Sequence, residues 1–359
     1  MEPSPTVLVI GAGPAGLATA ACLKQVRVPF RLVDRRGIAG GAFRHIYSGV
    51  TLQSPARYTS LPGLPLQAAG EYVTVPEYRA YLDRYADHHR LFVENAAVES
   101  VERLRERFLV HFAGVAYPVP YQIVVVATGM YDSPMWPTID GLTAGPLHPE
   151  ILHARSWPGP DRFRGQRLLI VGGATGAVEL GEECARAGLQ PTLSARSGVQ
   201  LTPQRFLGRD LHDYAYVVIE KIPVWLLDSF CGRRPTLPGI DHGFKEYRRA
   251  GQIRVRTEVR RFEAKEAVFA DGSREEFDAV VLATGYRFDM PFLSRQVARA
   301  PAGHPLATHG ESRSWPGLFF VGLPCERTLS SEFLRGIGQD APVVARRIKA
   351  RLAAARLRR

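Results

Sequence analysis

Apolar and polar residues follow a strand, turn, helix, strand order from the start of the chain. The apolar run Val7-Leu8-Val9-Ile10 leads directly into Gly11-Ala12-Gly13-Pro14-Ala15-Gly16. Apolar residues at helical spacing continue through Val26, and a second apolar run, Pro29 to Val33, ends on Asp34. The pattern predicts a βαβ unit that opens on Gly-x-Gly-x-x-Gly.

This unit has the layout that a dinucleotide site requires. Gly11 makes the tight turn, Gly13 lets the backbone approach a pyrophosphate, and Gly16 lets the helix pack close to the strand. The helix N-terminus faces the phosphate charge, and Asp34 is placed to accept ribose hydroxyls. The alternative interpretation is a glycine-rich turn with a purely structural role.

The same order appears a second time. The apolar run 168–171, preceded by Arg167, enters Gly172-Gly173-Ala174-Thr175-Gly176-Ala177, and the next strand ends on Arg196. Each unit is followed later by an apolar strand that ends in Ala-Thr-Gly, at 127–129 and 283–285. An internal duplication of this kind predicts an α/β fold with two Rossmann-like dinucleotide-binding domains.

The remaining patterns add detail to these two domains. A helix is predicted from Pro76 to Tyr85, a strand meander over 98–112, and a hairpin around 268–272. Prolines between 134 and 160 mark a connector. The aromatic segment Gln204–Tyr247 reads as a buried core helix, or alternatively as a surface at a substrate entrance, a membrane or a second subunit.

Composition narrows the function classes. A chain of 359 residues with 45% hydrophobic and 23% charged residues fits two globular domains. The net charge of +11 is spread along the chain rather than gathered, which argues against nucleic acid as a partner. No charged and apolar leader precedes the first strand, and no apolar run approaches the ~20 residues of a membrane span. We therefore expect a cytoplasmic protein.

Four cysteines stand apart in the sequence, and none belongs to a Cys-x-x-Cys pair. They are Cys22, Cys184, Cys231 and Cys325. The spacing supports neither a dithiol redox centre nor a zinc or other metal site. Cys22 and Cys184 fall inside the two predicted helices, where we expect small core residues.

The order of motifs resembles the two-dinucleotide flavoproteins, and among them the small bacterial flavin-containing monooxygenase group, related to Baeyer–Villiger monooxygenases. The resemblance covers nearly the whole chain and is carried by 40–44, where the family has Gly-Gly-x-Trp, and by 60–63, 283–287, 320–322 and 334–341. It implies a glutathione-reductase-like fold with the second unit inserted into the first. FAD-binding segments would be 1–160 and 289–359, and the NAD(P)H-binding domain 161–288.

The resemblance places FAD in the first site. The implied FAD residues are Gly11, Gly13, Ala15, Gly16, Asp34, Arg35, Gly41, Ala42, Phe43, Arg44, Gln53, Val98, Thr128, Gly129, Gly322, Gly338, Gln339 and Asp340. A helix starting near Gly338 would point its N-terminal dipole at the pyrimidine end of the flavin. Alternatively, Asp340 is simply a helix cap or first-turn acid.

The second site would hold NADPH. The implied residues are Gly172, Gly173, Ala174, Thr175, Gly176, Arg196, Thr284 and Gly285. Arg196 ends the second strand where a guanidinium suits a 2′-phosphate, which favours NADPH over NADH, unless it is a surface arginine. Ala174 and Ala177 replace the second and third glycines, and the Ala174 methyl group lies where the pyrophosphate contact should be close.

For activity, the resemblance implies a monooxygenase that uses NADPH and O2 and forms a C4a-peroxyflavin. The product would arise by N- or S-oxygenation or by Baeyer–Villiger oxidation of a small organic substrate. Gln53 stands where the family has the Asn of Asn-x-Pro, and Arg44 and Arg57 are candidates for stabilising a peroxide anion, with phosphate contact or surface charge as their alternative roles.

Other interpretations stay open from the sequence. His153, in His-x-x-x-Trp-Pro, orients the linker between domains or is a hydrogen-bonded linker histidine without chemistry. The rival functions are a flavoprotein reductase that passes electrons to a quinone or carrier protein, and a nucleotide sensor. Substrate identity and the formation of a homodimer are undecided.

Overall fold

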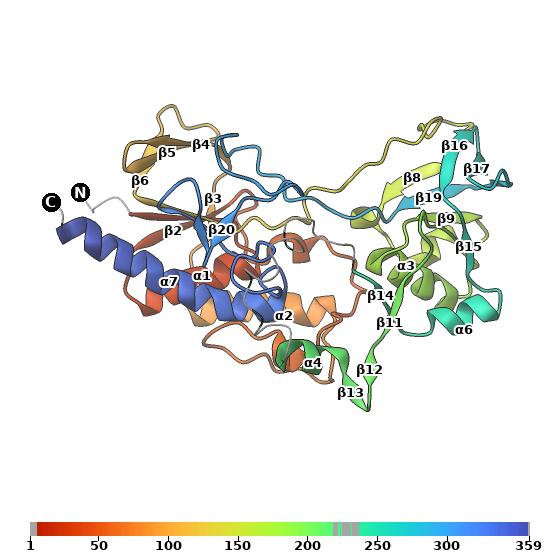
Figure 1. The fold of residues 1–359 in the computed structure, drawn as a ribbon, viewed down its shortest axis with the longest axis horizontal. Helices are drawn as coiled ribbons and strands as arrows, with labels where there is room; N and C mark the ends of the chain where they lie inside the picture. Colours follow the sequence, from red (N-terminus) through yellow and green to blue (C-terminus); the bar gives the residue numbers. More distant parts are fainter. Residues whose placement is uncertain (1–5, 218–221, 223, 225–230, 232–236, 358–359) are drawn as a thin grey trace.

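The computed structural model describes residues 6–217, 222, 224, 231 and 237–357, which form two lobes side by side (Figure 1). The first lobe is built on a seven-stranded sheet in the order β20-β21-β22-β7-β1-β2-β3. Its strands are β1 (Val7–Ile10), β2 (Phe30–Asp34), β3 (Glu94–Asn95), β7 (Ile123–Val126), β20 (Ala307–Thr308), β21 (Glu311–Ser312) and β22 (Leu318–Phe320). Strands β2, β1, β7 and β22 run parallel, and β1 and β7 are entirely buried, as a sheet covered on both faces requires.

Helices cover one face of this sheet and a meander covers the other (Figure 1). The helices are α1 (Pro14–Gln25), α2 (Val75–His88) and the long α7 (Leu334–Leu357). The meander is β4 (Val98–Leu104), β5 (Arg107–Phe112) and β6 (Val119–Tyr121), as the alternating pattern predicts. Alternate strand residues divide between two cores, so that Val7 and Val9 face the helices while Leu8 and Ile10 face the meander.

The second lobe repeats this arrangement on a smaller scale. Its parallel sheet has the order β15-β10-β9-β19-β8. The strands are β8 (Glu150–His153), β9 (Leu168–Val171), β10 (Thr192–Ser194), β15 (Arg254–Arg256) and β19 (Ala279–Leu282). Helices α3 (Thr175–Arg186) and α6 (Phe244–Arg249) pack on one face, and β16 (Val259–Glu263), β17 (Glu266–Phe269) and β18 (Arg274–Glu276) pack on the other. The two glycine motifs therefore belong to two lobes of similar architecture, each with a largely parallel sheet between helices and a small antiparallel sheet.

The chain passes from the first sheet to the second and back. All five strands of the second sheet lie between β7 and β20 in sequence, so segments 127–149 and 283–306 connect the lobes. Strand β8 lies before residue 160, the expected end of the first FAD-binding segment, yet it pairs with β19 in the second sheet. Its four residues are too few to show a period, so no pattern along the chain predicts this strand.

A further segment of the second lobe reaches the first. Strands β11 (Leu201–Pro203) and β14 (Gly239–Asp241) pair, and the hairpin β12 (Arg205–Phe206) and β13 (Arg209–Asp210) leads into α4 (Leu211–Val217). Arg57 Nη2 donates to Asp213 at 2.6 Å, and Arg205 pairs with Glu71. Residues 204–217 thus form an arm that contacts the first lobe, whereas Phe244 of α6 is buried in the core of the second lobe. The described part of 204–247 is therefore not the single core helix that was expected, and Trp225, Leu226, Leu227 and Phe230 lie outside the described residues.

The cysteine prediction needs correction. Cys231 and Cys325 form a disulfide although 94 residues separate them, and both line the cavity between the lobes. Only the fold could bring them together. Cys22 and Cys184 are buried free thiols, as predicted. Within the described ranges, no helix is long and apolar enough to span a membrane, and no cluster of side chains resembles a metal site.

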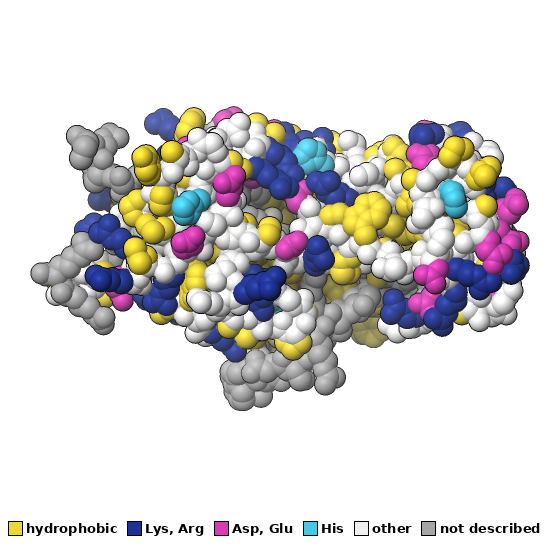
Figure 2. All heavy atoms as spheres, turned by 90° about the horizontal axis from the view of Figure 1, so that it is seen from above, with side chains coloured by type: hydrophobic (Ala, Val, Ile, Leu, Met, Phe, Trp, Pro, Cys, Tyr) yellow, Lys and Arg dark blue, Asp and Glu magenta, His cyan; other side chains and the backbone are white. Residues whose placement is uncertain are grey.

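The charged side chains on one face of the molecule are mixed in sign (Figure 2). Lys and Arg side chains are spread over the face in Figure 2, interspersed with Asp and Glu at the second lobe, and no single basic patch dominates that view.

Candidate functional site

A single cavity of about 2780 Å³ lies between the two lobes, and both glycine turns line it. This exceeds the ~300–1,000 Å³ of an ordinary small-ligand pocket and suits two large ligands. The parallel strands β1 and β9 both end at this cavity. In sheets of this kind, ligands bind beyond the carboxyl ends of the strands, so the cavity lies where a ligand is expected.

The first turn contains glycines of two kinds. Gly11 has φ +101°, and a Cβ there would lie 2.7 Å from Ala127 O, while a Cβ on Gly16 would lie 1.8 Å from Gly11 O. These two glycines are required by the fold itself. A Cβ on Gly13 would meet only Gly41 Cα, at 4.0 Å, so within the described structure a methyl group fits. The open side of Gly13 faces the cavity, as a pyrophosphate cradle requires.

Polar groups around this turn fit the adenosine and phosphate parts of FAD. Asp34 Oδ2 accepts from Ala12 N at 3.0 Å, which fixes the carboxylate at the end of β2 beside the turn. Gly41 packs against Gly13, and Val98 and Arg35 line the same cavity. The residues around the first turn therefore fit FAD.

Thr128 and Gly129 close the cavity after β7. Thr128 Oγ1 is buried and has no hydrogen-bond partner among the described residues. Gly129 has φ +65°, and a Cβ there would meet no described atom within 4 Å. A buried hydroxyl without a hydrogen-bond partner destabilises the fold, and a ligand atom that hydrogen-bonds to Thr128 would remove this cost.

The second turn is built alike but is less open. Gly172 has φ +150°, and a Cβ there would lie 2.5 Å from Ala283 O. Ala177, in place of the third glycine, is fully buried against Gly172, so the packing of α3 on β9 accepts its methyl group. A Cβ on Gly176 would meet no described atom within 4 Å. Gly173, Ala174, Thr175, Thr284 and Gly285 all line the cavity.

Arg196 lies at the rim with a second arginine nearby. Its side chain is 83% exposed, and its Nε lies 3.2 Å from Glu258 Oε1. Arg260 pairs with the other oxygen of Glu258, at 3.1 Å. Two guanidinium groups thus flank one carboxylate at the rim of the cavity, and no motif in the sequence pointed to Arg260.

Of the three catalytic candidates, only Gln53 lines the cavity. Arg44 is turned away, because its Nε donates to Ala39 O at 2.7 Å and its other end pairs with Asp83 on α2. Arg57 is held by Glu71 and Asp213. Neither arginine lines the cavity, and each has a carboxylate partner that sequence spacing did not reveal. The structure therefore does not bring them together with Gln53, and their contact with a peroxide anion stays a prediction.

The start of α7 also differs from expectation. The helix begins at Leu334, four residues before Gly338, so Arg335 and Ile337 line the cavity instead of Gly338, Gln339 and Asp340. Asp340 is no cap: it is buried in the second turn and pairs with Arg327. Gly322 does line the cavity.

Gln53 meets the second lobe. Its Nε2 donates to Glu179 Oε1 at 2.5 Å, and Glu179 lies on α3, the helix that starts at the second turn. Desolvation raises the pKa of Glu179 to about 7, against the lowering effect of the Gln53 hydrogen bond. Four residues along α3, Glu183 accepts from Trp157 Nε1 at 3.0 Å and is also hydrogen-bonded to Tyr47 of the first lobe.

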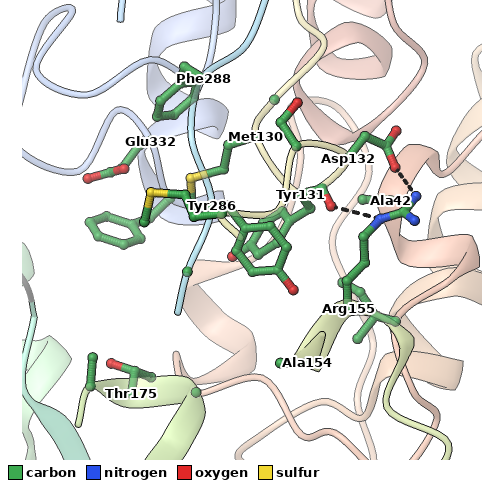
Figure 3. A pocket seen from close by; sticks show the side chains of 18 of the residues that line it. Ala42, Met130, Tyr131, Asp132, Ala154, Arg155, Thr175, Tyr286, Phe288 and Glu332 are labelled. Atoms are coloured by element: carbon green, nitrogen blue, oxygen red, sulfur yellow. Dashed lines mark hydrogen bonds and ion pairs between the residues drawn. The ribbon is translucent and has the colours of Figure 1, made fainter. Parts of the chain in front are cut away.

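The two connectors meet in a charged and aromatic cluster (Figure 3). Arg155 donates to Asp132 Oδ1 at 2.7 Å and to Tyr131 O at 3.1 Å, and Tyr131 and Tyr286 pack with ring centroids 5.0 Å apart. Burial opposes ionisation of Asp132, but hydrogen bonds from Arg36 and Arg155 outweigh it and lower its pKa to about 2. Thr175 lies across the open space from Tyr286 in Figure 3.

His153 belongs to this cluster and not to the cavity wall. Its Nδ1 accepts from Arg155 N at 3.0 Å, and its ring contacts those of Trp136 and Tyr286. Burial lowers the pKa of its imidazole. This placement agrees with a linker histidine.

Sequence reasoning missed Glu179, Asp132 and the cysteine pair. Glu179 sits in Glu-x-x-Glu-Glu of a predicted helix, which is an ordinary exposed pattern. Asp132 follows Ala-Thr-Gly by only two residues, and that closeness was the one signal available.

Two family models match parts of this chain. Residues 8–207 match the family described as pyridine nucleotide-disulphide oxidoreductase, and residues 244–304 match that described as flavin-binding monooxygenase-like. A probable indole-3-pyruvate monooxygenase, YUCCA8 of Arabidopsis thaliana, is 27% identical over 95% of this chain and 88% of its own.

Two solved structures share the fold. A flavin-containing monooxygenase from Stenotrophomonas maltophilia has a TM-score of 0.80 at 23% identity, over 96% of this chain and 98% of its own. The protein OTEMO, solved in complex with FAD and NADP, has a TM-score of 0.76 at 16% identity, over 99% of this chain and 87% of its own.

Proposed function

We propose that this chain, which belongs to the pyridine nucleotide-disulphide oxidoreductase family, is an FAD- and NADPH-dependent monooxygenase that oxygenates a small organic substrate. The observation that carries the proposal is the one cavity lined by both glycine turns. Two dinucleotides bound there would meet inside it, as hydride transfer between them requires.

We assign FAD to the first turn and NADPH to the second. The FAD domain would comprise residues 1–160 and 289–359, less strand β8, with the NADPH domain inserted between. Gly13, Asp34 and Thr128 would hold FAD at its pyrophosphate, ribose and flavin parts. Arg196, with Arg260 beside it, would bind the 2′-phosphate of NADPH.

When bound, FAD supplies the redox chemistry, accepting hydride and reacting with O2. The chain's contribution is to orient the two cofactors and exclude water. The connectors help to do this, because Tyr131 and Tyr286 stand in the wall between the turns. We infer N- or S-oxygenation or Baeyer–Villiger oxidation as the reaction types, since each needs only an activated oxygen.

The test uses FAD-loaded protein, NADPH and isotopically labelled O2 with a thioether, a tertiary amine and a cyclic ketone as probes. We expect one labelled oxygen atom in one probe product for each NADPH consumed. Reduction of an added disulfide or quinone, with neither labelled product nor oxygen uptake, would contradict the proposal.

A second candidate rests on the Cys231–Cys325 disulfide in the cavity wall. A flavoprotein reductase could pass electrons to a disulfide there, an option that the sequence spacing had argued against. An anaerobic assay separates the two: added NADPH would reduce this disulfide to two thiols in the reductase, whereas the disulfide would remain oxidised in the monooxygenase.

A further inference from the structure

Three glutamates lie on α3, Glu179 in one turn and Glu182 and Glu183 in the next, and each has different partners. Glu182 is buried and accepts from the backbone of His242 at 2.8 Å and of Phe244 at 2.9 Å, which is a structural role within the second lobe. Glu183 is bound by the Trp157 indole. Glu179 lines the cavity, and its partner among the described residues is the amide of Gln53, 126 positions away on the first lobe.

Gln53 stands beside the predicted flavin region. Its neighbour Ser54 accepts from Arg335 Nη1 at 3.4 Å at the start of α7, and both Gln53 and Arg335 line the cavity. Gln53 Nε2 is engaged by Glu179, whereas Gln53 Oε1 accepts no hydrogen bond from any described residue. The carbonyl end of this amide is therefore the end left for a ligand.

We propose that Glu179 is a positioning residue of the flavin reaction: its carboxylate holds the amide nitrogen of Gln53 and so presents the Gln53 carbonyl oxygen to the flavin side of the cavity. The inference rests on the proposed function. An ionised carboxylate can only accept hydrogen bonds, so the amide nitrogen must face it. A carbonyl so placed accepts from N–H or O–H groups on the flavin side. A flipped amide would donate there instead.

Protonation of Glu179 would release this control. A neutral carboxylic acid can donate as well as accept, so both orientations of the Gln53 amide become available. The charged groups acting on Glu179 are Glu182 and Glu183 on its own helix, and the first lobe faces this stretch with Gln53 and Tyr47. Both glutamates disfavour its ionisation. Desolvation is the main cause that raises the pKa of Glu179 to about 7, and the two glutamates add to it, so its charge can change near neutral pH.

The first measurement uses the FAD-loaded full chain with NADPH in air and records hydrogen peroxide released per NADPH from about pH 6 to about pH 8. In the wild type this leakage falls as pH rises through about 7. In Glu179→Gln it is higher at high pH, by roughly threefold to tenfold, and flat with pH, since two amides pair in either orientation. The control Glu246→Gln, an exposed glutamate on α6, behaves as the wild type.

The double variant Gln53→Leu with Glu179→Gln separates positioning through Gln53 from a direct effect of Glu179. Gln53→Leu removes the amide, so its leakage is high and flat with pH, and adding Glu179→Gln changes nothing further if Glu179 acts by positioning Gln53. A further rise in the double variant shows that Glu179 acts without Gln53. That result overturns the inference, as does an unchanged Glu179→Gln profile.

A readout on the cofactor-free protein completes the test. Carbon NMR of labelled glutamate carboxyl groups should show one that titrates near pH 7, absent in Glu179→Gln and shifted upward in Gln53→Leu. The absence of such a group overturns the inference but not the proposed function. A loaded wild type that neither oxidises NADPH in air nor oxygenates a probe overturns both.

Discussion

At the residue scale, the space around a glycine distinguishes a position required by the fold from one reserved for a ligand. Gly11 and Gly16 have no room for a methyl group because backbone atoms lie within 2.7 Å and 1.8 Å of the position that their Cβ would take. Gly13 has room on the protein side. The three glycines of one motif therefore have separable effects.

We predict that Gly13→Val folds but fails to retain FAD, because the added side chain fills the approach of the pyrophosphate. The unfolding free energy should change by less than about 1 kcal/mol, while FAD per chain after gel filtration falls at least about tenfold. The exposed Gly70→Val serves as a control that stays yellow. A Gly13→Val protein with one FAD per chain would refute the site.

Arg196→Ala should raise KM for NADPH about tenfold and leave KM for NADH nearly unchanged, because a charge-assisted contact to the 2′-phosphate is lost at an exposed position. Steady-state rates with each nucleotide check this. Arg162→Ala, on an exposed arginine of the same lobe that pairs with Glu150, is the control. Equal effects on both nucleotides would remove Arg196 from the 2′-phosphate site.

At the element scale, the strand ends and connectors are tied together by Asp132. It pairs with Arg35 at 2.8 Å and Arg36 at 2.7 Å after β2, and with Arg155 at 2.7 Å after β8. One carboxylate thus joins the end of the first βαβ unit to the connector and to the second lobe.

Asp132→Asn should therefore destabilise the protein by about 2 kcal/mol at pH 7, as the depressed pKa of about 2 implies. The stabilisation is fully present above the unfolded pKa of about 3.9 and is lost as pH falls through the folded value. Urea unfolding at a series of pH values should show the wild type and variant converging between about pH 4 and about pH 2. A difference that persists unchanged at the lowest pH would show that packing, not charge, is responsible.

The features that could be predicted from the sequence are those formed by residues close together along the chain. The two βαβ units, the meander and α2 rest on residues a few positions apart, and the structure contains them. The cavity-facing turns were predicted for the same reason. The carboxylate partners of Arg44 and Arg57 could not be predicted because they lie on other elements, and Glu179 was missed because Gln53 is 126 positions away. The sequence leaves such long-range pairs undetermined.

At the scale of the whole molecule, the Cys231–Cys325 disulfide joins the inserted segment to the loop after β22. We expect two thiols per chain under denaturing conditions without reductant, from Cys22 and Cys184, and four after reduction. Cys325→Ser should show three thiols in both conditions. Titration with a thiol reagent decides this, and four thiols in the unreduced wild type would show that the pair does not form.

The two lobes share one cavity, and the central claim is that NADPH reduces the flavin there and that the reduced flavin then reacts with oxygen. The most direct measurement reduces FAD-loaded protein with NADPH without air, admits oxygen, and follows the flavin spectrum. We predict complete reduction, then a transient spectrum that matches neither reduced nor oxidised FAD before the oxidised spectrum returns. Reduction followed by no reaction with oxygen, and reoxidation only by an added disulfide or quinone, would contradict a monooxygenase.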